Sequence, residues 1–416
     1  MSHEHKFRWW VGIDWASEAH QVCTLEANGR VVDERSVPHS GPGLGEFADW
    51  LTQLVGDPAS VAIAIEVPRG AVVETLVERG FQLFAINPKQ SDRFRDRYTS
   101  AGAKDDRRDA FVLADSLRTD MSCFRHVRLD EPQIIHLREL SRMEEDLGDE
   151  VGTLANRLRE QLHRFYAQLL HLCPAADEPW LWSLLELAPT PERGARLGKS
   201  KLESLLRTHR IRRFSAQNLL NRLREPALHV APGVVDAAAE HIAFLLPRLR
   251  LIHEQRRRCH QRLDQFLATL ASSAESGEMP EHRDAQILLS LPGVGRTVAA
   301  AMLGEASQPL ADRDYYTLRT LAGSAPVTRR SGKRCVVLMR RACNTRLRNA
   351  LHYWASGSIQ HDPRSKAHYA RLRSGGHTHG RALRGVADRL LNVLIAMLTH
   401  RSLYNPARRM RLELAA

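Results

Sequence analysis

Four acidic residues in the first third of the chain have types and spacing that suit metal-dependent chemistry. Asp14 ends the apolar run WWVGID, and Glu66 follows the apolar run VAIAI. Asp106 and Asp109 open an apolar helical pattern, and residues three apart on a helix share a face. Acidic residues are also common in a first turn, where they complement the helix dipole, so this pair alone is weakly informative. Among the four, Asp14 is the strongest candidate for a functional role. It directly follows an apolar run, and burying an unpaired carboxylate is costly.

Together these four carboxylates could bind metal ions. Residues at the ends of adjacent strands can lie a few ångströms apart, and a following helix can add its own carboxylates. Hard cations take oxygen ligands, and a pair of them can stabilise the attacking and leaving oxygens of a phosphoryl transfer. We therefore predict two Mg²⁺ ions at Asp14, Glu66, Asp106 and Asp109, and no organic cofactor. Asp105 is one position off the shared helical face and is expected at the surface or behind the ligands.

The last quarter of the chain has the composition of a nucleic-acid-binding segment. The chain has 416 residues and a formal net charge of +12, and residues 320–416 hold 19 Lys and Arg against 3 Asp and Glu. Such an excess predicts an anionic partner. A membrane surface is the competing partner, but the basic residues do not form one compact cluster of the kind that binds lipid headgroups.

A glycine-rich turn precedes this basic segment. In LLSLPGVGRTVAAAML, Pro292, Gly293 and Gly295 separate two helical patterns, and Arg296 opens the second. Glycines in such a turn let backbone N–H groups approach a phosphate at a helix N-terminus. The pattern is typical of a helix-hairpin-helix element that binds the nucleic-acid backbone, and a plain helical turn is the alternative.

Cysteine and histidine usage argues against other kinds of site. The six cysteines lack CxxC spacing, which argues against a zinc knuckle or a disulfide framework and fits a reducing cytosol. His377 and His379 come closest to metal-ligand spacing, and both are expected in a loop. The N-terminus is polar and no apolar run reaches 18 residues, so we expect no signal peptide, no membrane span and a cytoplasmic protein.

The elements that must position the acidic residues predict a mixed α/β domain. Asn28-Gly29 predicts a two-residue hairpin turn, and residues 60–67 suit a strand buried on both faces. The predicted elements, in order, are three strands within 9–36, a strand at 60–67, a helix closed by Gly80, a strand at 81–88, and helices at 88–100 and 105–117. Three meandering strands followed by alternating elements, with these acids, form a ribonuclease-H-like layout.

The rest of the chain reads as mainly helical. Apolar residues recur over 131–170 and over 234–272 with the spacing of long coiled-coil helices. The simplest interpretation is that these helices have a structural role or form a dimer. Further helices are expected at about 344–357 and 381–400. We therefore predict three domains: 1–125, which binds metal; 126–280, which is helical with an irregular insert at about 171–233; and 281–416, which contains the glycine-rich turn.

Several motifs in order resemble the DEDD transposases of the IS110 insertion sequences, which are related to pilin-gene invertases. The motifs are GIDWAS, IAIEVP, INP, AGAKDDRRDA, NRLRE, LPGVG and LAGSAP followed by RRSGK. The resemblance runs over about 9–400 and is weakest in 171–233. It implies a RuvC-like N-terminal domain, a coiled-coil region and a C-terminal transposase domain. It also implies recombination guided by a structured bridge RNA.

The resemblance assigns roles to particular residues. It implies Asp14, Glu66, Asp106 and Asp109 as the acidic tetrad and Ser331 of RRSGK as the nucleophile. A serine hydroxyl needs a base or a metal to become a good nucleophile. Ser324 of AGSAP is the rival candidate. The basic residues around Ser331 could neutralise a phosphate; these are Arg329, Arg330, Lys333 and Arg334.

Two segments depart from the pattern of the relatives. Many relatives follow the glutamate with Ala-Thr-Gly, whereas this chain has Val67-Pro68-Arg69-Gly70. The segment after Ser331 is CVVLMRRACN, where relatives tend to carry a glycine-rich basic stretch. The first departure alters the loop beside the predicted metal site, and the second alters the surroundings of Ser331.

These features predict a DNA recombinase in which Ser331 attacks a phosphate held by the Mg²⁺ site and forms a covalent DNA–serine intermediate. Because nucleophile and ligands are about 220 residues apart, assembly of a dimer or tetramer on paired DNA could gate cutting. A junction nuclease that uses water, or a non-enzymatic nucleic-acid-binding protein, are the alternatives. The basic residues expected to contact guide RNA are Lys89, Arg93, Arg95, Arg97, Arg157 and Arg159.

Overall fold

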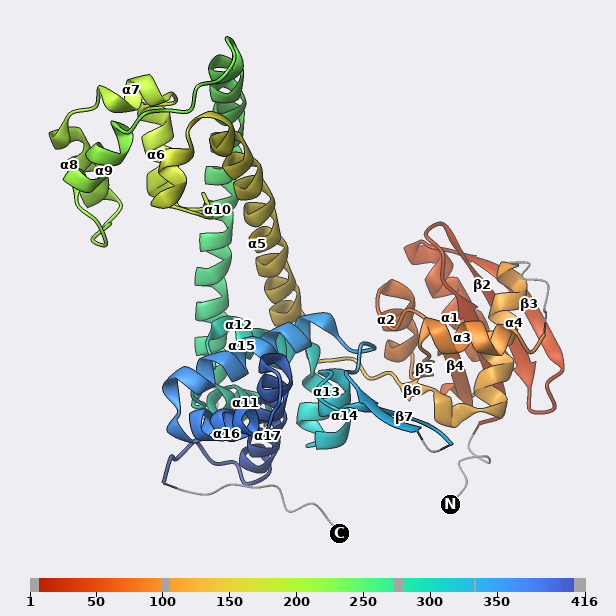
Figure 1. The fold of residues 1–416 in the computed structure, drawn as a ribbon. Coiled ribbons are helices and arrows are strands. Elements are labelled where there is room, and N and C mark those ends of the chain that lie inside the picture. Colours follow the sequence, from red (N-terminus) through yellow and green to blue (C-terminus); the bar gives the residue numbers. More distant parts are fainter. Residues whose placement is uncertain (1–6, 99–104, 273–279, 333, 408–416) are drawn as a thin grey trace. The chain divides into compact units, whose positions relative to one another are not determined.

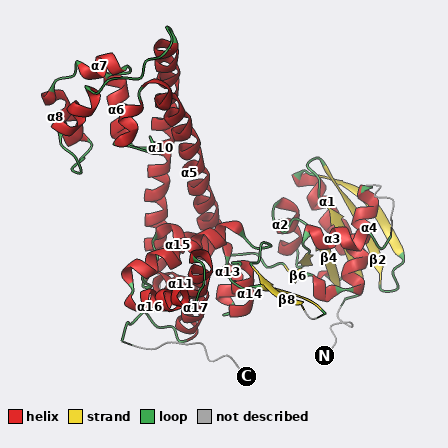
Figure 2. Ribbon diagram, in the orientation of Figure 1, coloured by secondary structure: helices red, strands yellow, loops and turns green. Residues whose placement is uncertain are grey.

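The chain forms two compact units in the computed structural model, Met1–Glu131 and Pro132–Ala416. Figures 1 and 2 show their helices and strands. The structure describes residues 7–98, 105–272, 280–332 and 334–407, with the backbone only for 280–283. Among these residues, no helix combines the length and the apolar character needed to cross a membrane.

The first unit is a mixed α/β domain, as predicted, and is built around a six-stranded sheet that includes one strand, β6, that was not predicted. The strand order is β3-β2-β1-β4-β5-β6, in which β1, β2 and β3 form an antiparallel meander and β1, β4 and β5 run parallel. The strands are β1 (Trp9–Asp14), β2 (Ala19–Glu26), β3 (Val31–Pro38), β4 (Val61–Ile65), β5 (Gln82–Ala85) and β6 (Arg125–His126). The helices are α1 (Gly41–Val55), α2 (Ala71–Glu78), α3 (Pro88–Arg95) and α4 (Asp106–Thr119), with short 3₁₀ turns at Pro58–Ser60 and Met121–Cys123.

Helices cover both faces of this sheet. Successive residues of a strand point to opposite faces, and β1 follows this rule with different partners on each side. Val11 and Ile13 pack with residues of α1 and α2, whereas Trp10 packs with residues of α4. All five residues of β4 are buried, as expected for a strand covered on both faces. Even-numbered positions of β1 and β4 therefore face α4.

The first unit differs from the sequence analysis at three places. Helix α1 was not predicted, because three glycines in GPGLG obscure a start that Ser40 caps through its side chain. The β2–β3 connection is longer than two residues, since Leu25 pairs with Val31 and the register shifts between Thr24 and Leu25. The helix expected over 88–100 ends at Arg95.

The second unit is helical apart from one hairpin. Its long helices are α5 (Pro132–Phe165) and α10 (Val234–Ser272), close to the predicted spans. Between them lie a 3₁₀ turn at Ala167–His171 and helices α6 (Pro179–Leu187), α7 (Pro191–Ala195), α8 (Lys199–Thr208) and α9 (Ala216–Leu223). After them come α11 (Pro280–Leu289), α12 (Arg296–Glu305), α13 (Ser307–Ala311), α14 (Tyr315–Leu321), β7 (Val327–Ser331), β8 (Arg334–Leu338), α15 (Thr345–His361), α16 (Pro363–Ser374) and α17 (His379–Thr399).

Helices α5 and α10 pack along one another and link two hydrophobic cores. One core joins the C-terminal half of α5 and the N-terminal half of α10 to α6–α9, with Trp180 and Trp182 at its centre. The other joins the opposite halves of the long helices to α11–α17, around Trp354. The segment 171–233, irregular by sequence, is therefore a folded helical cap on one end of the α5–α10 pair.

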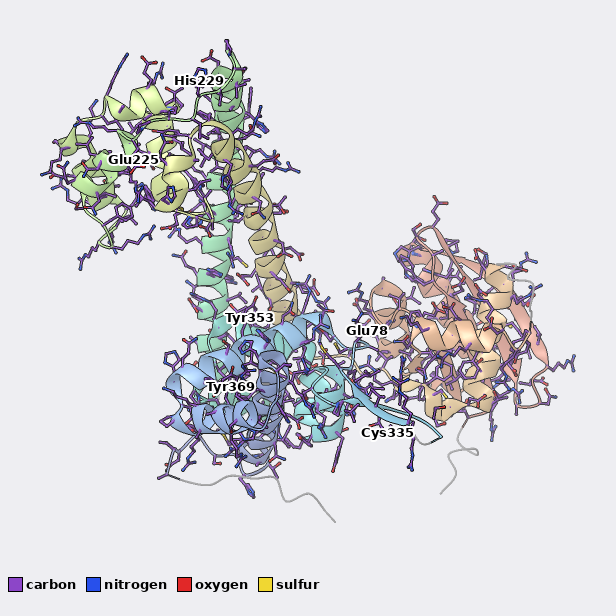
Figure 3. The ribbon with its side chains drawn as sticks, in the orientation of Figure 1. Glu78, Glu225, His229, Cys335, Tyr353 and Tyr369 are labelled. Carbon is purple, nitrogen blue, oxygen red and sulfur yellow. The ribbon has the colours of Figure 1, made fainter. Side chains whose placement is uncertain are left out.

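The sequence analysis missed several elements of the second unit, among them the β7–β8 hairpin and α16. The β7–β8 hairpin has mostly exposed residues, so it lacks the alternation of apolar and polar residues that marks a half-buried strand. Helix α16 is also mostly exposed and strongly basic. It therefore lacks the apolar stripe by which a helix is recognised in a sequence. His379, expected in a loop, begins α17, and Tyr369 (labelled in Figure 3) is hydrogen bonded to it at 2.8 Å.

Candidate functional site

Strand register places Asp14 and Glu66 side by side at one edge of the sheet. Ile13 of β1 pairs in parallel with Ile65 of β4. Asp14 and Glu66 are the next residues after this pair, so they lie beside one another at the ends of the two neighbouring strands. Both residues are half-buried. Their even-numbered positions share the parity of Trp10 and Ala64, which face α4. The alternation of the strands thus directs both carboxylates toward the helix that carries Asp106 and Asp109.

Helix α4 supplies two further carboxylates from its first turn. Asp105 is the N-cap, and its side chain accepts a hydrogen bond from the backbone N–H of Arg107 at 3.2 Å. Asp106 and Asp109 follow on the shared helical face. One carboxylate oxygen from each of Asp14, Asp106 and Asp109 lies within 4.8 Å of the other two. The structure therefore brings together three of the four predicted ligands and leaves Asp105 with a capping role.

Asp109 is the buried member of this group. Its side chain is 4% exposed, and its Oδ1 accepts a hydrogen bond from Arg95 Nε at 2.7 Å. Its Oδ2 is buried without a hydrogen-bond partner among the described residues. A buried carboxylate oxygen without a partner is costly, and a divalent cation bound by neighbouring carboxylates would satisfy it. The residues present therefore fit the divalent metal that the acidic pattern implies.

Glu66 is adjacent to this group but not part of it. It is absent from the set of mutually close oxygens formed by the other three acids. Glu66 and Asp92 both lie close enough to Arg95 for their charges to act on it. Burial lowers the pKa of Arg95, while Asp109, Asp92 and Glu66 raise it, and the net shift is upward. Arg95 thus holds a positive charge beside the acidic group, a role that the sequence analysis did not foresee.

The close approach of β1 and α4 depends on Gly12. A Cβ at Gly12 would lie 1.9 Å from the Ala110 backbone oxygen and 2.6 Å from the Ala114 nitrogen. Gly12→Ala would therefore push α4 away from β1 and separate Asp14 from the two carboxylates of α4. We expect a loss of about 3 kcal/mol or more in the free energy of unfolding, together with loss of stabilisation by Mg²⁺, both measured by denaturant titration.

Gly45→Ala is the matched control for this prediction. Gly45 lies inside α1 of the same unit, and its Cβ would meet nothing within 4 Å. Alanine is the better helix former, so this variant is expected to keep or raise stability by up to about 1 kcal/mol. Equal stability of Gly12→Ala and the wild type would contradict the argument that backbone contact positions the site.

A second group of possible ligands serves a structural purpose. Atoms of Cys173, Asp177 and Glu178 also lie within 4.8 Å of one another. Glu178, however, accepts hydrogen bonds from Arg213 at 2.7 and 2.8 Å and from Trp180 Nε1 at 3.1 Å. The hydrogen bonds from Arg213 lower the pKa of Glu178. Its carboxylate is thus engaged in fastening the helical cap.

Ser331 lies at the tip of the β7–β8 hairpin in the second unit. It is the last residue of β7, is exposed, and pairs with Arg334 across the turn. Gly332 follows with a φ of +53°, a left-handed conformation that glycine adopts at little cost. The basic segment around Ser331 is therefore a pair of strands, on which Figure 3 labels Cys335. Lys333 lies outside the described residues.

Arginines surround Ser331 on this hairpin. Cross-strand partners share a face, so Ser331 and Arg334 point to the same side, as does Arg329 two residues before the serine. Arg330 and its partner Cys335 point to the other side. Within the described part of the chain, the side chains of Arg329, Arg330 and Arg334 form no hydrogen bond or ion pair. Their charges are available to a phosphate beside the serine hydroxyl.

Ser324, the rival of Ser331, belongs to a hydrogen-bond network inside the second unit. Its hydroxyl lies 3.0 Å from Asp388 Oδ1 and 3.3 Å from the Arg319 carbonyl oxygen. Asp388 also accepts hydrogen bonds from Arg319 at 2.9 and 3.0 Å and from the Tyr315 hydroxyl at 3.1 Å. This environment fits a residue that fastens α14 to α17.

The turn between α11 and α12 is built partly for packing. Gly293 has a φ of +82°, and a Cβ there would lie 2.5 Å from the Ser358 nitrogen. The Pro292 carbonyl accepts a hydrogen bond from Trp354 Nε1 at 3.1 Å. Gly295, by contrast, is exposed and caps α12 without a side-chain hydrogen bond. Arg296 forms an ion pair with Asp264 of α10, so its charge is partly engaged.

The two glycines of this turn are therefore expected to respond differently to alanine. Gly293→Ala should lose about 1–3 kcal/mol of stability from backbone strain and contact with α15. Gly295→Ala meets no atom within 4 Å and should change stability by less than about 1 kcal/mol. If α12 binds phosphate at its N-terminus, Gly295→Ala should weaken DNA binding about three- to tenfold, measured by fluorescence anisotropy. Unchanged DNA affinity with unchanged stability would identify a plain helical turn.

The residues expected to contact RNA fall into two groups. Arg95 is bound to Asp109 and Asp92, and Arg97 is ion-paired with Asp120 at 2.9 Å. The other four residues are exposed on α3 and α5; they are Lys89, Arg93, Arg157 and Arg159.

Comparison with known proteins finds similar sequences that cover most of the chain. Residues 11–167 match a family model of transposases of the DEDD type from IS110, and residues 285–370 match a model of transposases of the IS116/IS110/IS902 family. The putative transposase y4uE of Sinorhizobium fredii is 51% identical over 209 residues, which are 50% of this chain and 58% of that relative.

Two longer matches come from Streptomyces coelicolor. The mini-circle putative transposase for IS117 is 32% identical over 409 residues, 95% of each chain. The 43.6 kDa protein of insertion element IS110 is 28% identical over 414 residues, 98% of each chain. The first family model spans the acidic group, and the second spans the glycine-rich turn and the basic hairpin.

Proposed function

Because the chain belongs to the IS116/IS110/IS902 family of transposases, we propose that it recombines DNA by metal-dependent transesterification at Ser331. The observation that carries this proposal is the group of Asp14, Asp106 and Asp109, whose oxygens lie within 4.8 Å of one another with the Oδ2 of Asp109 unsatisfied. The strand order of the first unit supports a ribonuclease-H-like, RuvC-like domain, since a meander followed by parallel strands is that layout.

The acidic group is proposed to hold Mg²⁺ against the scissile phosphate. Bound there, the cation would polarise the phosphate and stabilise charge on the attacking and leaving oxygens. Asp14, Asp106 and Asp109 supply the close oxygens, and Glu66 lies at the same edge of the sheet to complete the set. Arg95 orients Asp109 through its 2.7 Å hydrogen bond.

Ser331 is proposed to be the nucleophile. Its Oγ forms a bond to phosphorus as the bond from phosphorus to one bridging oxygen breaks, and the serine proton is taken up so that the DNA ends in a free hydroxyl. A hydroxyl end of the partner strand then attacks the phosphoserine ester, which rejoins the DNA and releases the serine. One ester replaces another at each step, so no high-energy cofactor is consumed. Arg329 and Arg334 share the face of Ser331 and can neutralise the phosphate.

Ligands and nucleophile belong to separate units of the chain. We propose that they act together only when DNA brings them into one site, as a dimer or tetramer on paired substrates. A structured guide RNA would supply the choice of target, and the exposed basic residues of α3 and α5 are candidate contacts. A strictly monomeric protein that recombines DNA would contradict the proposed gating.

The experiment that tests the function is recombination of two DNA substrates by the purified protein. Reactions contain the flanking transcript of the element and Mg²⁺, with one arm lacking the RNA and one containing EDTA. Products are run with and without protease, because protein-linked DNA changes mobility only before digestion. We expect recombinant joints only in the complete reaction. Cutting without joints and without linked DNA would identify a nuclease that uses water, and binding without cutting would identify a non-enzymatic binding protein.

A further inference from the structure

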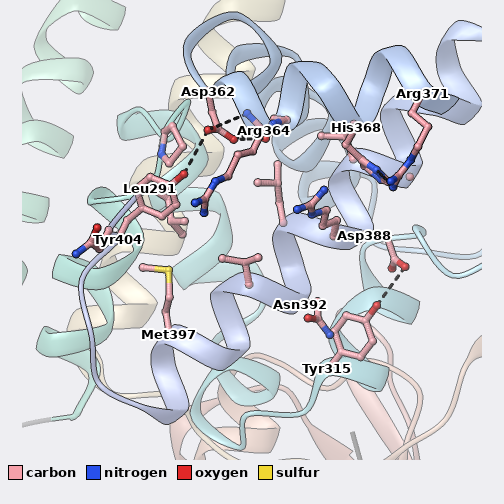
Figure 4. A pocket seen from close by; sticks show the side chains of 18 residues that line it. Leu291, Tyr315, Asp362, Arg364, His368, Arg371, Asp388, Asn392, Met397 and Tyr404 are labelled. Carbon is pink, nitrogen blue, oxygen red and sulfur yellow. Dashed lines mark hydrogen bonds between the residues drawn. The ribbon is translucent and has the colours of Figure 1, made fainter. Parts of the chain in front are cut away.

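A pocket of about 640 Å³ lies in the second unit between α16, α17 and the turn before α12. Figure 4 shows its lining, with Tyr404 and Tyr315 toward opposite ends. One part of the wall is apolar and includes Leu291, Val393 and Met397. The pocket is not used by the recombination chemistry proposed above.

The other part of the wall is cationic. Arg364 and Arg371 of α16 and Arg389 of α17 line the pocket together with Asp362 and Asp388. Three arginines thus line the pocket against two aspartates, and Asp388 is already paired with Arg319. Asp388 is held by Arg319, Tyr315 and Ser324 as described above.

Asp362 caps the N-terminus of α16. It accepts hydrogen bonds from the Ser365 backbone N–H at 2.9 Å and the Ser365 hydroxyl at 2.7 Å, and from the Tyr404 hydroxyl at 3.3 Å. The Arg389 side chain, in contrast, is exposed and forms no hydrogen bond or ion pair with any residue that the structure describes. The lining therefore carries more positive than negative charge.

His368 lies within this cationic wall. Burial lowers its pKa, and the charges of Arg389 and Arg371 lower it further, against a backbone hydrogen bond with Gly385. Arg371 lies 2.8 Å from His368 Nδ1, an arrangement in which the neutral ring accepts the hydrogen bond. Cations that repel one another around a pocket are the arrangement that a bound anion stabilises.

We propose that this pocket holds one unpaired nucleotide of a nucleic-acid strand, with its base on the apolar wall and its phosphate beside Arg364 and Arg389. The proposal rests on the proposed function only in taking the chain to bind nucleic acid. The volume is ample for a nucleotide. A free phosphate would need the arginines alone, whereas the apolar wall, the tyrosines and Asn392 match the faces and edges of a base.

The position of the pocket supports the same ligand. Pro292 lines it and also begins the PGVG turn that leads into α12. A strand whose backbone followed the N-terminus of α12 would therefore pass the mouth of the pocket. Bases that leave a duplex or belong to a loop are those that proteins bind in such cavities.

The test measures whether the full-length protein prefers a probe with an unpaired nucleotide. Duplex DNA and duplex RNA probes each carry one bulged 2-aminopurine, and matched probes are fully paired. Affinity is read by anisotropy and base environment by 2-aminopurine fluorescence, in EDTA so that no cutting occurs. We expect a preference for the bulged probe of about tenfold, with the DNA and RNA arms identifying the source of the nucleotide.

Variants assign the preference to the pocket. Arg389→Ala and Arg364→Ala should each remove most of it and cancel the change in 2-aminopurine fluorescence. Arg381→Ala, an exposed arginine of α17 outside the pocket lining, is the control and should keep the preference. Equal binding of bulged and paired probes by the wild type, or an unchanged preference in both pocket variants, would overturn the proposal. Recombination without a preference for the bulged probe would contradict the pocket proposal but not the proposed function. A preference for the bulged probe without recombination would contradict the proposed function but not the pocket proposal.

Discussion

Asp106→Asn is expected to abolish recombination, with a loss of more than about a hundredfold in the rate of joint formation. Its carboxylate belongs to the group of three whose oxygens lie within 4.8 Å of one another, and asparagine keeps the size while removing the charge. Loss of a residue that merely orients a ligand costs about 10–100-fold, so loss of a ligand should cost more. The measurement is the rate of recombinant joint formation at saturating DNA and RNA.

The same variant separates a metal ligand from a structural acid. Mg²⁺ should raise the unfolding temperature of the wild type, because a ligand bound only to the folded state stabilises it by about 2.7 kcal/mol at a hundred times its Kd. Asp106→Asn should lose this dependence on Mg²⁺. Without metal its stability should change by less than about 1 kcal/mol, since Asp106 is exposed and only its favourable interaction with the helix dipole is lost.

Asp105→Asn provides the matched control. Asp105 is the neighbouring acid, caps α4, and lies outside the close group. Asparagine caps helices as well as aspartate does, so this variant should keep both recombination and the response to Mg²⁺. Full activity of Asp106→Asn, or loss of activity in both variants to the same extent, would refute the assignment of Asp106 as a ligand.

Ser331→Ala is expected to remove protein-linked DNA and recombinant joints together, with a loss of more than about a thousandfold. Its hydroxyl is proposed to make the covalent bond to DNA, and alanine has no atom that could replace it. Ser331 is exposed at the hairpin tip, so the substitution should leave the stability of the fold unchanged. The measurement is the protease-sensitive shift of labelled DNA on a denaturing gel.

Ser324→Ala should give the opposite pattern. Its hydroxyl is hydrogen bonded to Asp388 and to the Arg319 carbonyl inside the second unit, so its loss should cost about 1 kcal/mol of stability. Linked DNA should still form. Loss of the adduct in Ser324→Ala with its retention in Ser331→Ala would transfer the nucleophile to Ser324. Cutting by Ser331→Ala without any adduct would indicate attack by water.

Local sequence patterns were sufficient to predict the α/β class of the first unit and the positions of its acids at the ends of strands and the start of a helix. A run of apolar residues that ends in Asp14 or Glu66 already indicates a buried strand with a carboxylate at its end. The spacing of Asp106 and Asp109 places both on one face of a helix. Such features depend on residues within about one turn or one strand, so neighbouring positions in the sequence carry the information.

Features set by contacts between distant residues could not be read in this way. The 1.9 Å approach that excludes a Cβ at Gly12, and the hydrogen bond of Arg95 to Asp109, depend on how α3 and α4 lie against the sheet. The exposed β7–β8 hairpin lacks a buried face, so no apolar alternation marks its strands.

The sequence by itself determined the family resemblance, the acidic positions and the basic C-terminal quarter, because these are properties of residue type and spacing. Only the tertiary structure decided which acids approach one another, that Ser324 is engaged in a network while Ser331 is exposed, and that α16 and α17 enclose a cationic pocket. The physical reason is that burial and hydrogen bonding are settled by packing between segments far apart in the chain. Packing gives the same residue type a structural role at one position and a chemical role at another.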